Sequence, residues 1–478
     1  MMEQTSAKKS LWSGTVLAGV CDGAIDGALA RPITGISIDT RTIEAGDLFV
    51  ALKDQRDGHN FVTAAFKAGA EAALVAKTYT RRDGDGALIR VADPLQALQE
   101  AGRIARFRTD AKVVAVTGSV GKTGTKEMLR LCLGRAGATH ASEKSYNNHW
   151  GVPLTLARMP VETHYGVFEI GMNHAGEIGP LVRMVAPDVG VITTVEAVHL
   201  AHFNSVDEIA EAKAELLQGI AADGVAILNR DNAFFDLLQM RAEERSLRVV
   251  SFGSHERADV RLVSIEGADG GSEIRANVHG APRTYHLGAA GRHYALNSLT
   301  VLAAIVALGA DLDVCVPALA AVEAPAGRGA RSEIPYRGGK ILLIDESYNA
   351  NPASMAAALA NLGAVPRMAY GRRIAVIGDM RELGTEAEAL HRGLAGALDL
   401  AGADLVFACG EHMRALYDAL PQGRRGAYGR TSSELLPSVA AAMAAGDAVM
   451  IKGSLGTNMA PLVKTVREIG SDKSKTSN

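Results

Sequence analysis

The sequence predicts an α/β protein of three domains, and its length and its strand–helix pattern both support this fold class. The chain has 478 residues, which corresponds to about three domains at roughly 150 residues each. Short apolar runs alternate with helical segments, as is typical of mostly parallel sheets covered by helices on both faces. We predict a small α/β domain over 1–108, a central domain with a mostly parallel sheet over 109–325, a Rossmann-like α/β domain over 326–470 and a disordered tail over 471–478.

The expected elements follow from local patterns in each domain. The expected helices cover 61–69, which ends at Gly69, and 122–135, which follows a Gly-rich turn. A segment rich in Gly and Pro over 324–331 is expected to be a linker. The expected strands cover 36–39, 48–52, 73–76, 113–116, 165–170, 189–193, 225–228, 341–344, 373–377, 404–408 and 448–451.

The composition excludes several functional classes. Lys and Arg total 50 and Asp and Glu total 53, which gives a net charge of −3. This near-balance argues against a nucleic-acid partner, because binding a run of phosphates needs a clustered basic excess. The four cysteines lie far apart in the sequence. They therefore form neither a zinc motif nor a disulfide framework, which fits a reducing cytoplasm.

No segment of the sequence is expected to cross a membrane. The stretch over 11–21 follows two lysines, as in a weak signal peptide, but Ser13, Gly14 and Gly19 interrupt it. We interpret it as an early amphipathic helix. The most apolar later stretch, 299–310, is too short to span a bilayer. The sequence therefore predicts a soluble, cytoplasmic protein, and we expect a monomer.

The strongest local signal is a phosphate-binding loop between an expected strand and an expected helix. Its residues are Thr117, Gly118, Ser119, Val120, Gly121, Lys122 and Thr123. The glycines let backbone N–H groups curl around phosphate oxygens, and the helix N-terminus adds partial positive charge. Lys122 is suited to reach the β- and γ-phosphates, and the Thr123 hydroxyl to bind Mg²⁺. The general pattern has Gly where this chain has Val116, so a plain Gly-rich turn is the alternative.

A phosphate-binding loop predicts a nucleoside triphosphate but not a reaction. A P-loop switch or motor module would also use it, with an Asp at the end of an apolar strand as the magnesium partner. The nearest strand here, 165–169, ends in Glu169, and the chain shows no basic groove or coiled coil. These features favour a different use of the loop.

Further motifs follow one another in order from about residue 11 to about residue 466. They are 37–41, 46–52, 57–59, the phosphate-binding loop, 147–148, 151–156, 169–173, 176–178, 199–200, 212–213, 291–293, Asn297, 345–352, 378–380, 382–384 and 452–454. In this order the chain resembles the Mur ligase family of ATP-dependent enzymes, which form amide bonds in the cell-wall peptide. The resemblance implies a first domain that binds a uridine nucleotide, a central ATPase domain and a C-terminal ligase domain.

Within that family, the chain resembles the enzymes that ligate D-alanyl-D-alanine to UDP-N-acetylmuramoyl-tripeptide. The reaction implied proceeds through an acyl phosphate and a tetrahedral intermediate, and uses ATP and Mg²⁺. The resemblance assigns catalytic roles to Lys122, Glu169, His199 and Lys213. One Mg²⁺ would lie near Thr123 and Glu169, and a second near His199 and a carbamylated Lys213. Without the resemblance, Lys213 would be interpreted as a surface lysine among the glutamates of its helix.

The resemblance also implies the remaining binding residues. For ATP these are Asn297, Arg328 and Glu346, in addition to the loop. For the substrates they are Ser37, Asp39, Thr40, Arg41, Asn148, Thr155, Asn349, Asn351, Lys452 and Ser454. The chain departs from the family pattern at Tyr294, where Asn is usual, at Glu346, where Asp is more common, and at Leu455, where Arg is usual. Lys452 and Ser454 are therefore expected to hold the dipeptide carboxylate; the alternative is that Lys452 reaches water from a strand end.

Two sibling ligases remain as alternatives. The enzyme that adds the third peptide residue typically carries an Asp-Asn-Pro-Arg motif, which is absent from 326–478. Folylpolyglutamate synthase lacks the uridine domain. The sequence leaves open whether the third residue of the tripeptide is diaminopimelate or lysine.

Overall fold

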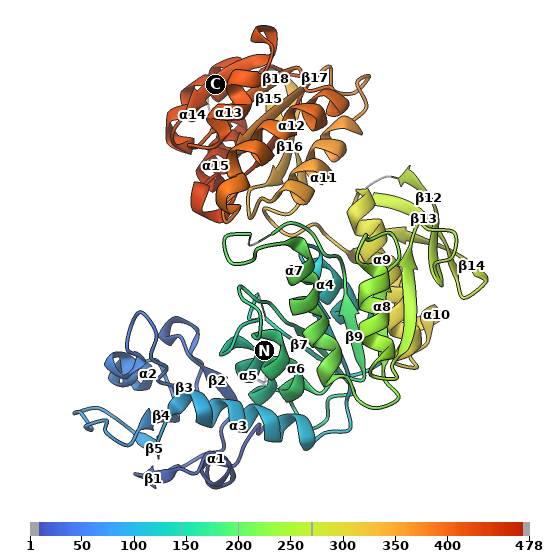
Figure 1. The fold of residues 1–478 in the computed structure, drawn as a ribbon. Helices are drawn as coiled ribbons and strands as arrows, with labels where there is room; N and C mark the ends of the chain where they lie inside the picture. Colours follow the sequence, from blue (N-terminus) through green and yellow to red (C-terminus); the bar gives the residue numbers. More distant parts are fainter. Residues whose placement is uncertain (1–8, 144, 199, 269–270, 472–478) are drawn as a thin grey trace, which may run out of the picture.

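The computed structural model describes residues 9–143, 145–198, 200–268 and 271–471. Figure 1 shows three bodies, with the N-terminal body at one end of the molecule and the C-terminal body at the other. Each body is built on its own sheet, so the predicted α/β class with three units is confirmed. The expected metal ligand His199 and the expected tail beyond residue 471 lie outside the described residues. No helix in the described ranges has the length and apolar character needed to cross a membrane.

The N-terminal sheet has the strand order β1-β5-β4-β3-β2. Its strands are β1 Ala24–Asp26, β2 Gly35–Ser37, β3 Asp47–Val50, β4 Ala72–Ala76 and β5 Ala87–Val91. Its helices are α1 Gly14–Val20, α2 Val62–Lys67 and α3 Pro94–Phe107. The expected strand over 36–39 ends early, at Ser37, because the Asp39 carboxylate accepts a hydrogen bond from Arg41 N and caps a short 3₁₀ turn.

The central sheet has the order β14-β13-β12-β11-β10-β9-β6-β8-β7. Its strands are β6 Lys112–Thr117, β7 Thr139–Ala141, β8 Tyr165–Glu169, β9 Val189–Ile192, β10 Val225–Asn229, β11 Arg248–Gly253, β12 Val260–Ala268, β13 Gly271–Val278 and β14 Ala281–Leu287. Its helices are α4 Lys122–Ala136, α5 Gly151–Ala157, α6 Ile178–Val185, α7 Val206–Ala214, α8 Phe235–Glu243, α9 Arg292–Ala307 and α10 Leu312–Cys315. Apolar clusters cover both faces, one under α4 and α9 and one under α5 to α8.

The strands of the central sheet from β7 to β12 run parallel, as expected. The antiparallel extension β12 to β14 is a feature that the sequence analysis missed. Its strands bury alternate residues and expose the others, so they lack the continuous apolar runs that marked the parallel strands.

The C-terminal sheet has the order β15-β16-β20-β17-β18-β19, and its antiparallel edge strand is β15. Its strands are β15 Ala330–Tyr336, β16 Gly339–Glu346, β17 Arg372–Gly378, β18 Leu405–Cys409, β19 Arg425–Gly429 and β20 Asp447–Lys452. Its helices are α11 Pro352–Gly363, α12 Ala387–Ala401, α13 Met413–Ala419, α14 Ser432–Ala442 and α15 Ala460–Ser471. The expected linker over 324–331 was too long, because Ala330 and Arg331 already pair with Asp345 and Ile344.

The N-terminal and central bodies meet in a buried joint. Ala157 of α5 belongs to the same apolar cluster as Trp12 of the N-terminal body. Trp12 Nε1 donates to Ala157 O at 2.8 Å, and the Arg108 guanidinium carbon lies 3.7 Å from the indole centre. Gly102 lets α3 approach α5 closely, because a Cβ there would lie 2.9 Å from Pro153 O. These contacts fix the N-terminal sheet to the central body.

The C-terminal body is joined to the central body differently. Tyr294 Oη donates to Arg328 O at 2.6 Å, and Ala201 N donates to Glu382 O at 3.1 Å. Within the described ranges, no apolar cluster contains side chains from both of these bodies. The chain segment that connects the two bodies and the polar contacts between them therefore hold this joint.

Candidate active site

The phosphate-binding loop connects the end of β6 to the start of α4, as the sequence predicted. Gly118 and Gly121 have φ of +148° and +89°, values that favour glycine. A Cβ at Gly118 would lie 1.9 Å from Thr193 Oγ1, and one at Gly121 would lie 2.8 Å from Asn297 Oδ1. Both positions thus require glycine for backbone conformation and for space.

Neighbouring segments hold this loop in shape. Thr193 Oγ1 donates to Val120 O at 2.5 Å, and Ser119 Oγ donates to Glu196 O at 3.1 Å. Lys122 Nζ donates to Gly118 O at 2.6 Å, so its ammonium group lies across the mouth of the loop. Burial lowers the pKa of Lys122, while the nearby Glu169 carboxylate opposes this shift. The loop is therefore preorganised around a cation suited to phosphate.

A cavity of about 600 Å³ extends from this loop to the C-terminal body. It collects many residues that the sequence analysis had assigned to ATP, metal or substrate from distant parts of the chain. These lining residues are Ser119, Val120, Gly121, Lys122, Thr123, Glu169, Asn297, Arg328, Glu346, Asn349, Asn351 and Lys452. The cavity therefore unites the two bodies in one site. Thr117 and Gly118 do not line it, and both are buried behind the loop.

The donor set at one side of the cavity fits a divalent cation. Glu169 is 1% exposed; its Oε1 accepts from Asn147 Nδ2 at 2.7 Å, while its buried Oε2 has no hydrogen-bond partner. A buried carboxylate oxygen without a partner is costly unless a cation or a donor reaches it. The Thr123 hydroxyl lines the same cavity. The described residues contain no cluster of three or more His, Cys, Asp or Glu that would hold a metal alone, so further oxygen ligands would come from elsewhere.

Lys213 is a buried amine on α7. It is 2% exposed, which excludes the surface-lysine alternative. Burial lowers the pKa of Lys213 well below its ordinary value, and the positive charge of Lys122 lowers it further. In the described part of the chain, its Nζ makes no hydrogen bond or ion pair. Burial and the nearby positive charge of Lys122 therefore both disfavour the charged ammonium form of this side chain.

The C-terminal side of the cavity holds an ion pair and a stacked arginine. Lys452 and Glu346 are 2% and 8% exposed, with Nζ and Oε2 3.6 Å apart. Lys452 Nζ also donates to Asn349 O at 2.8 Å, so the alternative of a lysine that reaches water is wrong. Burial raises the pKa of Glu346, and Lys452 opposes that shift. The Arg328 guanidinium carbon lies 4.0 Å from the centre of the Tyr348 ring.

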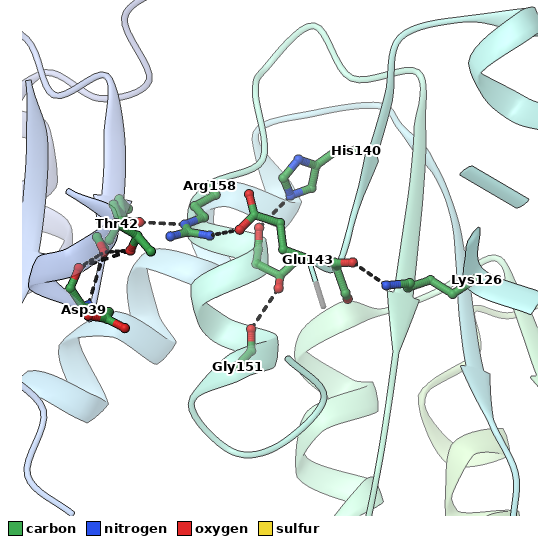
Figure 2. Close-up of polar contacts among 11 residues, drawn as sticks. Asp39, Thr42, Lys126, His140, Glu143, Gly151 and Arg158 are labelled. Carbon is green, nitrogen blue, oxygen red and sulfur yellow. Dashed lines mark hydrogen bonds and ion pairs between the residues drawn. The ribbon is translucent and has the colours of Figure 1, made fainter. Parts of the chain in front are cut away.

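The residues assigned to the uridine substrate lie away from this cavity. Ser37, Asp39 and Thr40 lie in the segment around the end of β2, and Asp39 pairs with the exposed Arg41 at 2.6 Å. Figure 2 shows Arg158 between this segment and Glu143. Arg158 Nε donates to Ile36 O at 2.6 Å and Nη1 donates to Glu143 Oε2 at 2.8 Å.

Four of the residues assigned to substrates also have structural roles. Thr155 Oγ1 donates to Gly151 O inside α5, and Asn148 Oδ1 accepts from Gly151 N. Asn351 caps α11, and Ser454 Oγ donates to Ala350 O at 3.2 Å. Thr155 is 3% exposed with its hydroxyl engaged, so this placement does not support direct contact between Thr155 and a substrate.

The cavity also contains residues to which the sequence analysis gave no individual role. They include Glu196, Asn229, Asp231, Asn232, His293 and Tyr348. A signal was present for three of them, because Asn229, Asp231 and Asn232 follow directly on the apolar run of β10, at the carboxyl edge of a parallel sheet where ligands bind. His293 and Tyr348 lie within the motifs 291–293 and 345–352, whereas Glu196 could be found only from the tertiary structure.

The fold and the site define a class of enzyme, the ATP-dependent ligases with three α/β domains. Three family descriptions match the chain: Mur ligase family, catalytic domain over 32–103; Mur ligase middle domain over 116–305; and Mur ligase, glutamate ligase domain over 330–455. The chain belongs to the Mur ligase family. The resemblance inferred from the sequence is thereby confirmed, and the P-loop switch or motor alternative is excluded.

Similar proteins span nearly the whole chain. The UDP-N-acetylmuramoyl-tripeptide–D-alanyl-D-alanine ligase of Escherichia coli strain K12 is 34% identical over 458 residues, covering 95% of this chain and 98% of its own. The protein of the same name from Rickettsia prowazekii strain Madrid E is 32% identical over 429 residues, covering 90% of this chain and 94% of its own. A crystal structure of MurF from Acinetobacter baumannii matches with a TM-score of 0.83 and 32% identity, covering 96% of this chain and 99% of that one.

Proposed function

We propose that this enzyme ligates D-alanyl-D-alanine to UDP-N-acetylmuramoyl-tripeptide, with conversion of ATP to ADP and phosphate. One observation carries the proposal: a single cavity joins Lys122 and Glu169 of the central body to Arg328 and Lys452 of the C-terminal body. An amide ligase needs this arrangement, because the nucleotide must meet a carboxylate donor and an amine acceptor in one place. Similarity over nearly the full length to ligases named for this reaction supports the choice of substrates.

The chemistry follows from the poor reactivity of a carboxylate. The tripeptide carboxylate oxygen attacks the γ-phosphorus of ATP, and ADP leaves with the electrons of the broken bond. The dipeptide amine then attacks the resulting acyl phosphate to give a tetrahedral intermediate, from which phosphate leaves as the amide forms. Each partner is anionic, so preorganised cations and N–H groups must hold them. Lys122 and the loop backbone are suited to the triphosphate, and Arg328 to the nucleotide from the opposite wall.

The donors at the Glu169 side fit one Mg²⁺, and a second Mg²⁺ is proposed beside it. Thr123 and the unpartnered Glu169 Oε2 would hold one, and His199 with a carbamylated Lys213 would hold the other. Bound Mg²⁺ would offset the negative charge that develops during phosphoryl transfer. The burial of Lys213 supports its modification, because burial favours the uncharged amine, and only an uncharged amine adds CO₂ and releases a proton to form a carbamate.

The proposed substrate-binding residues divide between the two joints of the molecule. Asp39, Thr40, Arg41 and Asn148 are proposed for the uridine substrate, at the joint between the N-terminal and central bodies. Lys452, Asn349 and Ser454 are proposed for the dipeptide carboxylate. Lys452 is already beside Glu346, so the dipeptide must compete with this carboxylate or share the lysine with it.

A direct assay tests the proposed function. Purified protein is incubated with ATP, Mg²⁺, UDP-N-acetylmuramoyl-tripeptide and D-alanyl-D-alanine, and the product mass is measured. We expect the mass of the pentapeptide, with ADP released in equal amount. Two matched reactions test the sibling ligases. In one, UDP-N-acetylmuramoyl-dipeptide is supplied with free diaminopimelate or lysine in place of the tripeptide and D-alanyl-D-alanine. In the other, folate is supplied with glutamate. Product in one of these reactions, and not in the first, would contradict the proposal in favour of a sibling ligase.

A further inference from the structure

The segment 379–384, called here the 379–384 loop, connects β17 to the turn before α12 and faces the central body. Glu382 O accepts from Ala201 N at 3.1 Å, and a Cβ at Gly384 would lie 3.4 Å from Leu200 O. Leu200 and Ala201 follow directly on position 199, the expected ligand of the second Mg²⁺. The loop is therefore a contact between the C-terminal body and the metal-side segment of the central body.

The other side of the same loop holds the end of β20. Ser454 N donates to Asp379 O at 3.0 Å, and Arg381 N donates to Ser454 Oγ at 2.9 Å. Thr457 Oγ1 donates to Asp379 O at 3.1 Å. These bonds tie the loop backbone to the segment that begins at Lys452, which lines the cavity. A shift of the loop would consequently move Ser454.

A buried histidine fixes the loop to α12. His391 is fully buried; its Nε2 accepts from Met380 N at 2.9 Å and its Nδ1 donates to Ala387 O at 2.6 Å. Only the neutral ring with its proton on Nδ1 can make both bonds. Burial lowers the pKa of His391, which favours this neutral form. Glu382, two residues beyond Met380, has φ of +63°, a strained conformation that must be held by its surroundings.

We propose that His391 is a positioning residue for the ligation reaction. By accepting the Met380 N–H, it holds the 379–384 loop in the shape that meets Ala201 on one side and Ser454 on the other. It thereby couples the contact between the C-terminal and central bodies to the position of Ser454, on the side of the site proposed for the dipeptide. This inference rests on the proposed function for the identity of D-alanyl-D-alanine as the substrate on this side of the cavity. The conformation of the 379–384 loop itself does not depend on that identity.

The test compares replacements of His391 that differ in their reach. His391→Gln keeps an acceptor able to approach Met380 N, while His391→Asn is too short and His391→Leu has none. Leu398→Ala is the matched control, because Leu398 is fully buried on the same helix and its apolar side chain makes no hydrogen bond to the loop, although it shares a cluster with Met380 and Leu383. Hydrogen exchange at the Met380 amide reports the loop. Steady-state kinetics give the KM for D-alanyl-D-alanine and for ATP separately.

We expect His391→Asn and His391→Leu to speed Met380 exchange and to raise the dipeptide KM, each by about tenfold, with the ATP KM changed far less. His391→Gln should stay near the wild type, and Leu398→Ala should lower the melting temperature without either effect. Equal increases in both KM values, or Met380 exchange no faster than in Leu398→Ala, would overturn the inference. If His391→Leu does not fold, the comparison of Gln with Asn decides. Loss of Met380 protection in an enzyme that never accepts the dipeptide would overturn the proposed function alone and support the loop assignment.

Discussion

The two joints of the molecule use similar contacts for different purposes. At the N-terminal joint, Arg108 stacks on Trp12, which is 3% exposed and shares an apolar cluster with α5. At the C-terminal joint, Arg328 stacks on Tyr348, which is 37% exposed and lines the cavity. The first pair is sealed into a core, and the second faces a binding site. An apolar joint fixes two bodies, whereas a polar joint around a cavity permits them to move when ligands bind.

The largest effect that we expect is a movement confined to the C-terminal joint. Binding of an ATP analogue together with the uridine substrate should draw the C-terminal body toward the central one, because the nucleotide contacts lie on both. Spin labels at Met368 and Val161, both exposed, report this joint, and labels at Val16 and Met240 report the N-terminal joint. The four native cysteines are buried and should not take up label. The comparison would be contradicted if the distance between the labels at Val16 and Met240 became shorter. It would also be contradicted if the distance between the labels at Met368 and Val161 did not change.

The next effect concerns the rate of ligation. Lys122→Ala should reduce kcat at saturating ATP by at least about 100-fold, the scale of losing a preorganised charge contact, and should leave the fold intact. Lys112→Ala is the control, since Lys112 is an exposed lysine at the start of β6, the strand that leads into the phosphate-binding loop. Activity and thermal melting are measured on both variants. Near-normal turnover of Lys122→Ala would remove this lysine from the proposed mechanism.

At the N-terminal joint, the main effect should be on stability. Trp12→Ala removes a buried indole and its bond to Ala157 O, and should lower the free energy of unfolding by about 3–5 kcal/mol. The folded fraction should keep its KM for ATP. Urea unfolding and initial rates measure the two quantities, with Val16→Ala on the exposed face of α1 as the control. A rise in the ATP KM without loss of stability would show that this joint also controls the nucleotide site.

The matching change at the C-terminal joint should act on binding. Tyr348→Ala removes the ring beneath Arg328 and should raise the KM for ATP by about two- to fivefold, the range for an exposed cation–π contact. Tyr348→Phe keeps the ring and should behave nearly as the wild type. Titration calorimetry with an ATP analogue checks the same effect at equilibrium. Equal affinity of the Ala and Phe variants would mean that the stacked pair does not hold the nucleotide.

The smallest effect is a pH dependence at α5, the helix of the central body that packs against the N-terminal body. His140 Nε2 donates to Thr155 O at 2.7 Å, and burial lowers the pKa of His140 below its ordinary value of 6.5. As the pH falls below about 6.5, the unfolded chain takes up this proton before the folded one, so stability contributed by neutral His140 is lost. His140→Gln keeps a donor and should flatten the acid side of the stability curve. His149→Gln, at an exposed position, should not, and equal curves would exclude the assignment.

The sequence predicted the part of the candidate site whose residues are neighbours in the chain. The phosphate-binding loop needs glycine at two positions, a lysine and a hydroxyl within a few residues, and these are visible as a motif. The parallel strands were equally clear, because burial on both faces leaves continuous apolar runs. Lys213 was expected in the site only through the family resemblance, since its own neighbours in sequence are acidic and suggest a solvent-exposed helix.

Only the tertiary structure decided which charged and polar side chains lie close enough to interact. The pairing of Lys452 with Glu346 arises because β16 and β20 are neighbours in the sheet although more than a hundred residues separate these side chains. The bond from His391 to Met380, the unpartnered Glu169 oxygen and the burial of Lys213 likewise depend on packing between distant elements. Local sequence fixes the backbone geometry of a loop or strand. The burial and the electric field at a side chain are set by elements that meet only when the chain has folded.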